Sequence, residues 1–219
     1  MAAERGGAHR VELCAKLAVG GLTPGEELMR QVRGQVQLPI FAMIRPRAGD
    51  FVYSVAEFER MRSAIENAKR LGMDGVVFGL LTKDRRIDVL RTKELMEDAR
   101  PLPVTFHRAF DACVDLLKSL EDVIKTGAAR ILTSGGAPNA PEGVYSLANL
   151  VAQARERAII VPGSGINAGN ILLVAQKSNA CEFHSGLGTQ LPYGSKNYLR
   201  FENEVRRMAS ALAEPQLKG

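Results

Sequence analysis

Short apolar runs recur along the chain, and each is followed by a polar loop and a segment with helical spacing. The runs begin about 23 to 35 residues apart, which is the length of a strand–helix unit. Because they are short and rich in valine, isoleucine and phenylalanine, we expect strands that are buried on both faces. The predicted strands are Arg10–Cys14, Ile40–Ile44, Gly75–Phe78, Val104–Phe106, Arg130–Thr133, Ile159–Pro162 and Glu182–His184.

The helices between these runs have recognisable start signals. A capping box, in which a hydroxyl residue precedes glutamate by three positions, occurs at 23–26 and again at 54–57. The first box carries proline at its second position, and the second opens a helix that we expect to end at Leu71 and Gly72. Asp115 is expected to cap a further helix. Apolar residues with helical spacing also cover 142–156, 167–177 and 198–212.

Strands that alternate with helices indicate a parallel sheet with right-handed crossovers. Glycines at 7, 72 and 127 precede strands and predict left-handed turns at helix ends. Seven or eight such units favour a closed TIM-type (β/α) barrel over an open sheet, and the glycine-rich turn of a dinucleotide-binding sheet does not occur. Residues 1–8 resemble the end of a helix, so we expect the barrel to lack its first strand and most of its first helix. We expect one domain over 1–213 and a flexible tail at 214–219.

The charge pattern narrows the classes of partner. The net charge is +5, and lysines and arginines alternate with acids along predicted helices, which is typical of solvated helix faces. No aromatic residues interleave with a basic cluster, so we do not expect nucleic-acid binding. The three cysteines are far apart, which argues against a disulfide framework or a cysteine-rich zinc site and favours a cytoplasmic location. No segment is long and apolar enough for a membrane span.

Alternate residues of a barrel strand face the interior. This alternation predicts inward positions for Glu12, Cys14, Arg45, Thr105, His107, Glu182 and His184. A buried charge is costly unless it is paired, so Glu12 paired with Arg45 or Arg108 is a structural alternative to a functional role. Polar residues at the carboxyl ends of barrel strands line the active-site face of barrel enzymes, which favours the functional interpretation. Arg45 and Arg47 both follow the second run and belong to this candidate catalytic set, as does His184.

The segment from His107 to Asp111 places an imidazole, a guanidinium and a carboxylate at one strand end. His107 is a candidate general acid or base near neutral pH. Arg108 is a candidate for holding a carboxylate or phosphate. Asp111 could orient either group, although capping the next helix is the simpler role for an aspartate in a loop.

Two glycine-containing loops are candidate anion sites. Gly163, Ser164 and Gly165 follow the sixth run and open a helix, where backbone N–H groups can approach an anion. Ser134 and Gly135 form a similar, weaker candidate after the fifth run. The alternative is a tight turn that needs glycine for its backbone alone. The loop at 184–188 is expected to complete the first of these sites.

Cys14 is the candidate metal ligand. A thiolate at an inward strand end suits Cu(I), which prefers sulfur. The alternative is that Cys14 is a small core residue. A Cu(I) site needs a second soft ligand, and we expect Met43 to face inward mainly as core filler.

Eight segments together resemble the CutC copper-homeostasis family, in order and in spacing, from about Glu4 to His184. They are RVELC (10–14), GGLTP (20–24), MIRPR (43–47), GDFVY (49–53), DGVVFG (74–79), VTFHRAFD (104–111), ILTSG (131–135) and PGSGI (162–166). The resemblance implies a TIM-type barrel in the cytoplasm, and also in the nucleus, that forms homo-oligomers (dimers or tetramers). It also implies a role in copper handling with Cu(I) bound at cysteines. Cys14 matches one family cysteine, the other belongs to the first strand, and Ser164 stands where glycine is usual.

Two functions therefore remain open. The first is a copper-binding protein that contributes to copper tolerance, with Cys14 as ligand. The second is a barrel enzyme that acts on a small anionic substrate, expected to be phosphorylated, through the polar residues at the strand ends. A scaffold role is a third interpretation, but it leaves the polar cluster unexplained.

Overall fold

The computed structural model describes residues 1–187 and 197–213 of the 219-residue chain, and its strands form one parallel sheet. The sheet holds six strands in the order in which they occur along the chain. The strands are β1 Val11–Leu13, β2 Ile40–Met43, β3 Gly75–Phe78, β4 Val104–Phe106, β5 Arg130–Thr133 and β6 Ile159–Pro162. Each pairs in parallel with the next, as the alternation of strands and helices predicts.

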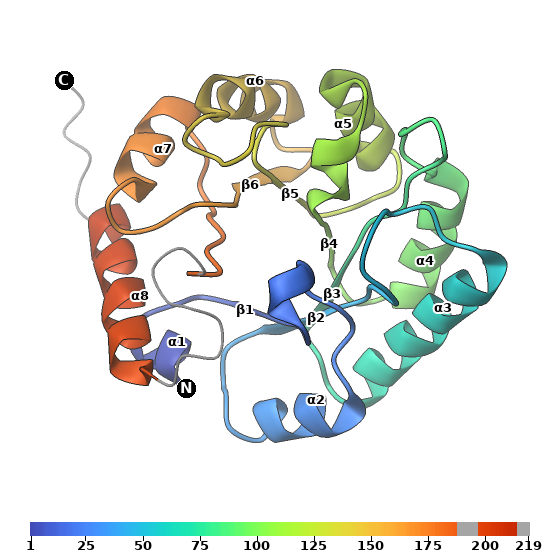
Figure 1. Cartoon of the computed structure of the whole chain (residues 1–219), viewed down its shortest axis with the longest axis horizontal. Coiled ribbons are helices and arrows are strands. Elements are labelled where there is room, and N and C mark those ends of the chain that lie inside the picture. Colours follow the sequence, from blue (N-terminus) through green and yellow to red (C-terminus); the bar gives the residue numbers. More distant parts are fainter. Residues whose placement is uncertain (188–196, 214–219) are drawn as a thin grey trace.

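Helices surround the curled sheet as an outer ring (Figure 1). The α-helices are α1 Ala2–Arg5, α2 Glu26–Arg33, α3 Val55–Arg70, α4 Val89–Ala99, α5 Leu116–Ile124, α6 Val144–Ala154, α7 Ile171–Ser178 and α8 Tyr198–Ala213. Two 3₁₀ turns, η1 Leu17–Val19 and η2 Arg108–Ala112, follow β1 and β4. The arrangement confirms the (β/α) barrel class, and among the described residues the six strands form a curled half-barrel.

The seventh predicted strand, Glu182–His184, is not a strand in the structure. It runs beside β6 with one backbone hydrogen bond, in which the His184 N–H donates to the Pro162 carbonyl at 2.9 Å. A single bond forms no strand ladder. The segment nevertheless brings its side chains to the barrel interior, as described below.

The main core lies between the sheet and the helices. Outward-facing strand residues such as Ile40, Phe78, Phe106 and Ile131 are fully buried there. The inner face carries a much smaller apolar cluster of Phe41, Met43 and Val77, with Cys14 packed against it. Apolar side chains therefore fill the outer layer, and the barrel interior is left to polar groups.

Two of the predicted helix starts are confirmed and one is wrong. Ser54 and Glu57 form a complete capping box at α3, and the Asp115 side chain accepts the Lys118 N–H at α5. The box predicted at 23–26 does not form, because α2 begins at Glu26 with Gly25 as its N-cap. The Thr23 hydroxyl instead accepts the backbone N–H of Arg45 at 2.8 Å and joins two loops. The sequence analysis also missed α4, which the side chain of Asp88 caps.

Glycine-containing helix ends occur where they are predicted. Gly7, Gly72 and Gly127 have φ values of +89°, +70° and +89°, in the region that favours glycine. Each turns the chain from a helix into the next strand.

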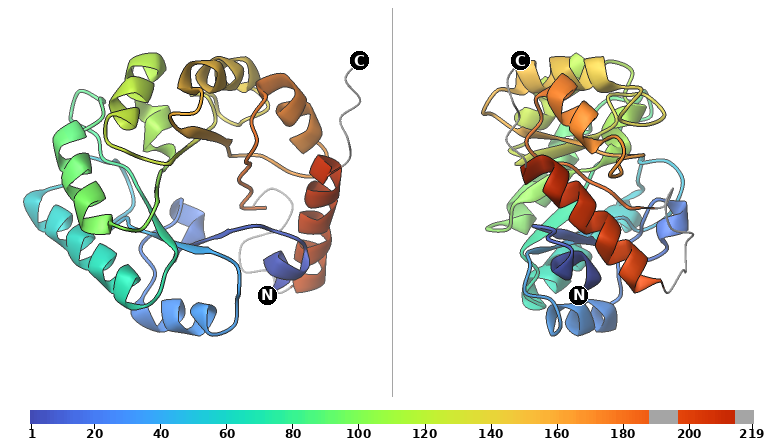
Figure 2. Two further views of the ribbon diagram at one scale, coloured as in Figure 1. Left: turned by 180° about the vertical axis from the view of Figure 1, so that it is seen from behind. Right: turned by 90° about the vertical axis from the view of Figure 1, so that its left-hand side faces the viewer.

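The first and last described helices pack together (Figure 2). The Arg5 guanidinium lies 2.7 Å from the Glu202 carboxylate, which joins α1 to α8. A Cβ at Gly6 would lie only 2.7 Å from Val205 Cβ, so the helices approach as closely as glycine allows. No helix of the described residues could cross a membrane. The predicted tail at 214–219 lies outside the described residues.

Candidate functional site

A cavity of about 2000 Å³ runs through the barrel interior. Pro39 and Pro103 line it just before β2 and β4, and Ser164 and Gly186 line it after β6 and near the last inner segment. β2 and β5 each contribute alternate residues to its wall (Phe41 and Met43, Arg130 and Leu132), whereas β1 lines it along its whole length. The cavity therefore joins the two ends of the barrel.

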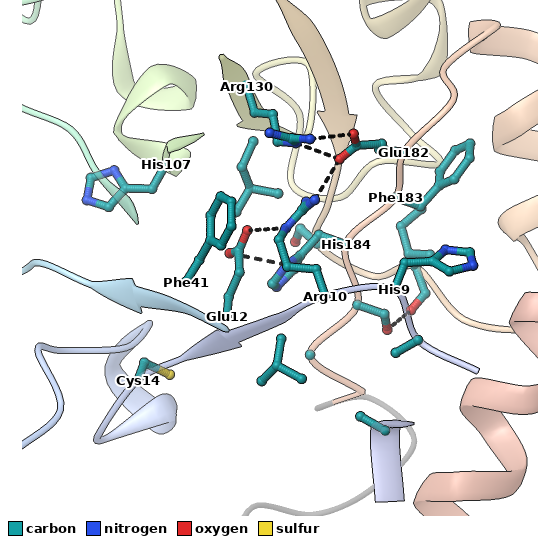
Figure 3. A pocket seen from close by; sticks show the side chains of 18 of the residues that line it. His9, Arg10, Glu12, Cys14, Phe41, His107, Arg130, Glu182, Phe183 and His184 are labelled. Atoms are coloured by element: carbon teal, nitrogen blue, oxygen red, sulfur yellow. Dashed lines mark hydrogen bonds and ion pairs between the residues drawn. The ribbon is translucent and has the colours of Figure 1, made fainter. Parts of the chain in front are cut away.

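Five charged or ionisable side chains form a continuous chain across this cavity (Figure 3). Arg130 binds the Glu182 carboxylate with two hydrogen bonds, of 2.8 and 3.0 Å. Arg10 donates a third bond to Glu182 at 2.8 Å, and its Nε lies 4.0 Å from Glu12 Oε1. The other Glu12 oxygen, Oε2, lies 3.3 Å from Nδ1 of His184. Arginine and glutamate side chains thus alternate along this row, which ends at His184. We call the five residues the charge chain.

The charge chain links β1 to the last inner segment. Arg10 and Glu12 lie on or beside β1, and Glu182 and His184 lie on the run after α7. These two parts of the chain form the two sides of the open sheet, and no strand ladder joins them among the described residues. Side-chain ion pairs therefore connect segments that backbone hydrogen bonds do not.

Glu12 is the most enclosed member of the charge chain, with its side chain only 6% exposed. Its Oε1 is buried and accepts no hydrogen bond within the described part of the chain. The alternative pairing of Glu12 with Arg45 or Arg108 does not occur, because Arg45 binds backbone carbonyls and Arg108 binds Asp111 and Ser134. Glu12 instead lies against Arg10, which is beside β1 on the same side of the gap, and against His184, which comes from the opposite side.

Phe41 forms an apolar support under the two arginines. Its ring centroid lies 5.1 Å from Arg10 Cζ and 5.9 Å from Arg130 Cζ, which is cation–π distance. Sequence analysis did not select either arginine as a site residue. A usable signal existed, since Arg10 precedes the inward Glu12 by two positions and alternation places both on one face.

Cys14 lines the cavity at the carboxyl end of β1. It packs against Met43, and both surround Gly21: a Cβ there would lie 3.1 Å from Cys14 Sγ and 3.6 Å from Met43 Cε. Burial, followed by the negative charge of Glu12, raises the pKa of the Cys14 thiol above its ordinary value. The thiol is therefore protonated at neutral pH in the free protein.

Arg45 clamps two loops at the barrel mouth. It is 6% exposed, and its Nη1 donates to the carbonyls of Val19 and Gly21 at 2.9 and 3.2 Å. Its Nη2 donates to the Gly49 carbonyl at 2.8 Å. These bonds tie the loop after β1 to the loop after β2 and hold Gly21 beside Cys14.

Arg47 lies outside the cavity lining and organises its own loop. Its Nε donates to Glu57 at 2.7 Å, and its Nη2 donates to Asp50 at 2.7 Å and to the Val52 carbonyl. These contacts raise the pKa of Arg47, with the Asp50 hydrogen bond as the largest cause. A catalytic role for Arg47 stays a prediction, and its contacts are those of a loop anchor.

His107 is buried at the end of β4, with 4% of its surface exposed. Burial, helped by the nearby Arg45 charge, lowers the pKa of His107 to about 3, so the imidazole is neutral at pH 7. Its Nδ1 accepts the Ala109 N–H at 3.2 Å, which leaves the proton on Nε2. Gly79 makes room for the ring, because a Cβ there would lie 2.7 Å from Nδ1. An acid–base role for His107 stays a prediction, and its low pKa does not favour one at neutral pH.

Asp111 connects the loop after β4 to the loop after β5. Its carboxylate accepts the Thr133 hydroxyl and the N–H groups of Ser134 and Gly136. It also accepts Nε of Arg108 at 2.7 Å. The helix-cap alternative for Asp111 is wrong, because a different aspartate caps α5.

Arg108 reaches the cavity mouth with its side chain 41% exposed. Besides Asp111, it donates from Nη2 to the Ser134 hydroxyl at 3.1 Å. The Ser134 hydroxyl in turn donates to the Ala137 carbonyl at 2.6 Å. Ser134 and Gly135 do not line the cavity. An anion site at these two residues stays a prediction, and the contacts of Ser134 are those of a residue that holds its loop in place.

The loop after β6 turns sharply at the cavity mouth. Ser164 and Gly165 line the cavity and both have φ +75°. Ser164 holds a left-handed conformation that favours glycine, which is the residue expected there from the family resemblance. Gly163 lies behind the mouth, where a Cβ would clash with Leu132 Cδ1. The packing of this turn thus requires glycine at position 163. Anion binding by the loop stays a prediction.

The structure brings most of the predicted site residues to one cavity. Those that line it are Glu12, Cys14, Arg45, His107, Arg108, Asp111, Ser164, Gly165 and His184. Those that do not are Arg47, Ser134, Gly135 and Gly163. Within residues 1–187 and 197–213, no group of three or more His, Cys, Asp or Glu side chains could hold a metal ion.

A family model described as the CutC family matches residues 1–189. A human protein named copper homeostasis protein cutC homolog is 44% identical over 211 residues, which are 96% of this chain and 76% of the human protein.

Solved structures give the same picture at the level of the fold. A crystal structure of the putative copper homeostasis protein CutC from Streptococcus agalactiae superposes with a TM-score of 0.78 at 33% identity, covering 81% of this chain and 88% of that one. Thiamine phosphate pyrophosphorylase from Pyrococcus furiosus superposes at 0.61 with 16% identity, over 96% of this chain and 86% of that one. At that identity the second likeness concerns the barrel fold alone.

Proposed function

The chain belongs to the CutC family, and from that premise we propose that it takes part in copper handling inside the cell by binding Cu(I) at Cys14. The observation that supports this proposal is the packing of two sulfur-bearing side chains, Cys14 and Met43, around Gly21. The names of the relatives refer to copper homeostasis, and the geometry supplies a candidate place for the ion.

The donor set at this place has the chemistry that Cu(I) prefers. Thiolate and thioether sulfurs are soft ligands and select Cu(I) over harder cations. Gly21 leaves open the space beside Cys14 Sγ that a Cβ would fill. Arg45 fixes this glycine by binding its carbonyl, so the space is held by the fold.

Cu(I) binding here requires loss of the thiol proton. Because burial and Glu12 raise the pKa of Cys14, the ion must displace a proton at neutral pH. The affinity is therefore expected to rise by about tenfold for each pH unit below the thiol pKa. This pH dependence distinguishes a thiolate site from a site made of carboxylates, which are already ionised.

Titration with Cu(I) under anaerobic conditions, in competition with a chromophoric Cu(I) chelator, tests the proposal. Cys14→Ser is expected to weaken Cu(I) binding by well over about tenfold, because it removes the thiolate. Cys181→Ser is the matched control, since Cys181 is a free, exposed cysteine away from Met43. Equal Cu(I) affinity of the wild type and Cys14→Ser would contradict the proposal.

A second candidate function is a barrel enzyme that acts on a small anionic substrate. The observation that favours it is the charge chain itself: Glu12 and His184 both line a cavity of about 2000 Å³, which is large enough for a metabolite. A thiolate copper site has no use for this carboxylate or for His184 beside it. Copper binding at the mouth and chemistry deeper in the cavity are compatible, because they use different side chains.

A further inference from the structure

Glu12 and His184 have the arrangement of a carboxylate–imidazole pair. Oε2 of Glu12 lies 3.3 Å from Nδ1 of His184, close to hydrogen-bond distance. The two residues come from opposite sides of the open sheet and meet inside the cavity. This inference rests on the second candidate function above and identifies the groups that carry it.

The pair has one enclosed member and one accessible member. The Glu12 side chain is 6% exposed, whereas the His184 side chain is 32% exposed and lines the cavity. A carboxylate next to Nδ1 favours the tautomer that carries its proton on Nδ1. Nε2 is then unprotonated and available as a base, as in other carboxylate–histidine pairs of hydrolytic and isomerising enzymes.

The neighbouring members of the charge chain surround Glu12. Arg10 Nε lies 4.0 Å from Oε1, and Arg10 is itself anchored by Glu182 at 2.8 Å. Glu182 receives two further bonds from Arg130. The charge chain therefore anchors the arginine beside Glu12, and Oε1 of Glu12 is buried without a hydrogen-bond partner among the described residues. A buried acceptor of this kind is costly unless a ligand donates to it.

We propose that Glu12 and His184 form a proton-transfer centre for a small anionic hydroxycarbonyl compound. Nε2 of His184 takes the proton from the carbon beside the carbonyl group, and the imidazolium so formed is stabilised by Glu12. The electron pair of the broken C–H bond moves onto the carbonyl oxygen as an enolate, and the same proton, or one exchanged with solvent, then returns to that carbon. The step is a reversible enolisation, so it needs no oxidant, reductant or second substrate.

The anionic part of the substrate has a place at the cavity mouth. Arg108 lines the mouth with its guanidinium 41% exposed, and it can bind an anion from the side of β4. Ser164 and Gly165, which follow β6, line the same cavity. A phosphate or carboxylate held there leaves the carbonyl end of a short substrate to reach His184.

The tautomer of His184 is the first test, because it needs no substrate. Nitrogen-15 NMR of the histidine side chains is expected to show the proton on Nδ1 of His184 at a pH where the ring is neutral. In Glu12→Gln, which removes the negative charge beside Nδ1, the preference for the Nδ1 tautomer is expected to weaken. A proton on Nε2 in the wild type, or an unchanged tautomer ratio in Glu12→Gln, overturns the pair.

Deuterium exchange is the second test, with dihydroxyacetone phosphate in D₂O as the probe. The wild type is expected to exchange the carbon-bound protons of the probe, followed by proton NMR. His184→Gln and Glu12→Gln are each expected to slow the exchange by about 100-fold or more. Glu94→Gln is the matched control, because Glu94 is exposed on a distant helix. Free imidazole is expected to restore part of the rate in His184→Gly, which a merely structural role would not allow.

The exchange experiment distinguishes failure of the Glu12–His184 pair from failure of the second candidate function. Exchange in the wild type that persists in His184→Gln overturns the pair and leaves the second candidate function standing. No exchange above the buffer rate in the wild type overturns both for this class of substrate. Neither result bears on Cu(I) binding, which Cys14→Ser tests separately.

Discussion

Oε2 of Glu12 on β1 and Nδ1 of His184 beyond β6 lie 3.3 Å apart, so the two sides of the open sheet meet through their side chains. One step further along the charge chain, Arg10 binds Glu182 across the same gap at 2.8 Å. Two pairs of neighbouring inward residues therefore face each other in register. The polar interior both joins the sheet edges and forms the wall of the cavity.

Glu182→Gln is expected to destabilise the fold by about 2 kcal/mol. Burial alone would raise the pKa of Glu182, but hydrogen bonds from Arg130 and Arg10 outweigh it and lower the pKa, so the carboxylate is ionised. Glutamine at this position has no charge, so the guanidinium groups of Arg10 and Arg130 lose the carboxylate that neutralises both of them. Urea unfolding at pH 7 measures the change. Asp98→Asn, which breaks a surface pair with Arg62, is the control and should cost less than about 1 kcal/mol.

Acidification below pH 6.5 is expected to destabilise the protein partly through His107. The pKa of His107 is about 3 in the folded protein, against 6.5 as its ordinary value. Between these values the unfolded chain binds the proton and the folded one does not, so stability falls as the pH falls, by up to about 1.4 kcal/mol per pH unit. His107→Asn removes this contribution. The loss of stability between pH 7 and pH 4.5 should be smaller in the variant, and an equal loss in both proteins would show that His107 is protonated in the folded state.

Alkylation by iodoacetamide is expected to modify Cys14 slowly at pH 8. Only the thiolate reacts, and burial together with Glu12 raises the pKa of this thiol. Glu12→Gln removes the second cause, so the alkylation rate of Cys14 should increase several-fold at the same pH. Peptide mass spectrometry gives the rate for each cysteine separately. The exposed Cys181 serves as the internal reference and should keep its rate in the variant.

Gly163→Ala is expected to destabilise the protein by about 1 to 3 kcal/mol, as overpacking of a filled interior does. An added Cβ would clash with Leu132 Cδ1 behind the cavity mouth. Gly186→Ala is the matched control, because a Cβ there meets no atom of the described residues within 4 Å and its backbone is not left-handed. Thermal unfolding of the two variants compares them directly. A Gly163→Ala protein as stable as Gly186→Ala would mean that the loop moves aside without cost.

Alternation along the strands was the most informative signal in the sequence. It placed Glu12, Cys14, His107 and His184 inside the barrel, and all four line the cavity. It succeeded because successive side chains of a strand point to opposite faces of the sheet, so alternate residues face the barrel interior and the rest face the helices. The same rule did not reveal which inward groups bind each other, since Glu12 and His184 are far apart in sequence.

Other features had no local signal. Arg45 binds backbone carbonyls of two loops, and no residue type in those loops marks them as acceptors. The low pKa of His107 depends on enclosure by residues of other strands, including the space that Gly79 leaves. The capping box predicted at Thr23 failed because its hydroxyl binds Arg45 N–H in a neighbouring loop, a tertiary contact that local spacing does not show.

The number of sulfur neighbours of bound copper is the most direct measurement on the proposed function. X-ray absorption of the protein loaded with one equivalent of Cu(I) should show two sulfur scatterers in the wild type, from Cys14 and Met43. Met43→Leu, which conserves volume, should retain one of them and bind Cu(I) more weakly by about tenfold. Copper surrounded only by nitrogen and oxygen, or an unchanged sulfur shell in Cys14→Ser, would contradict Cu(I) binding at Cys14.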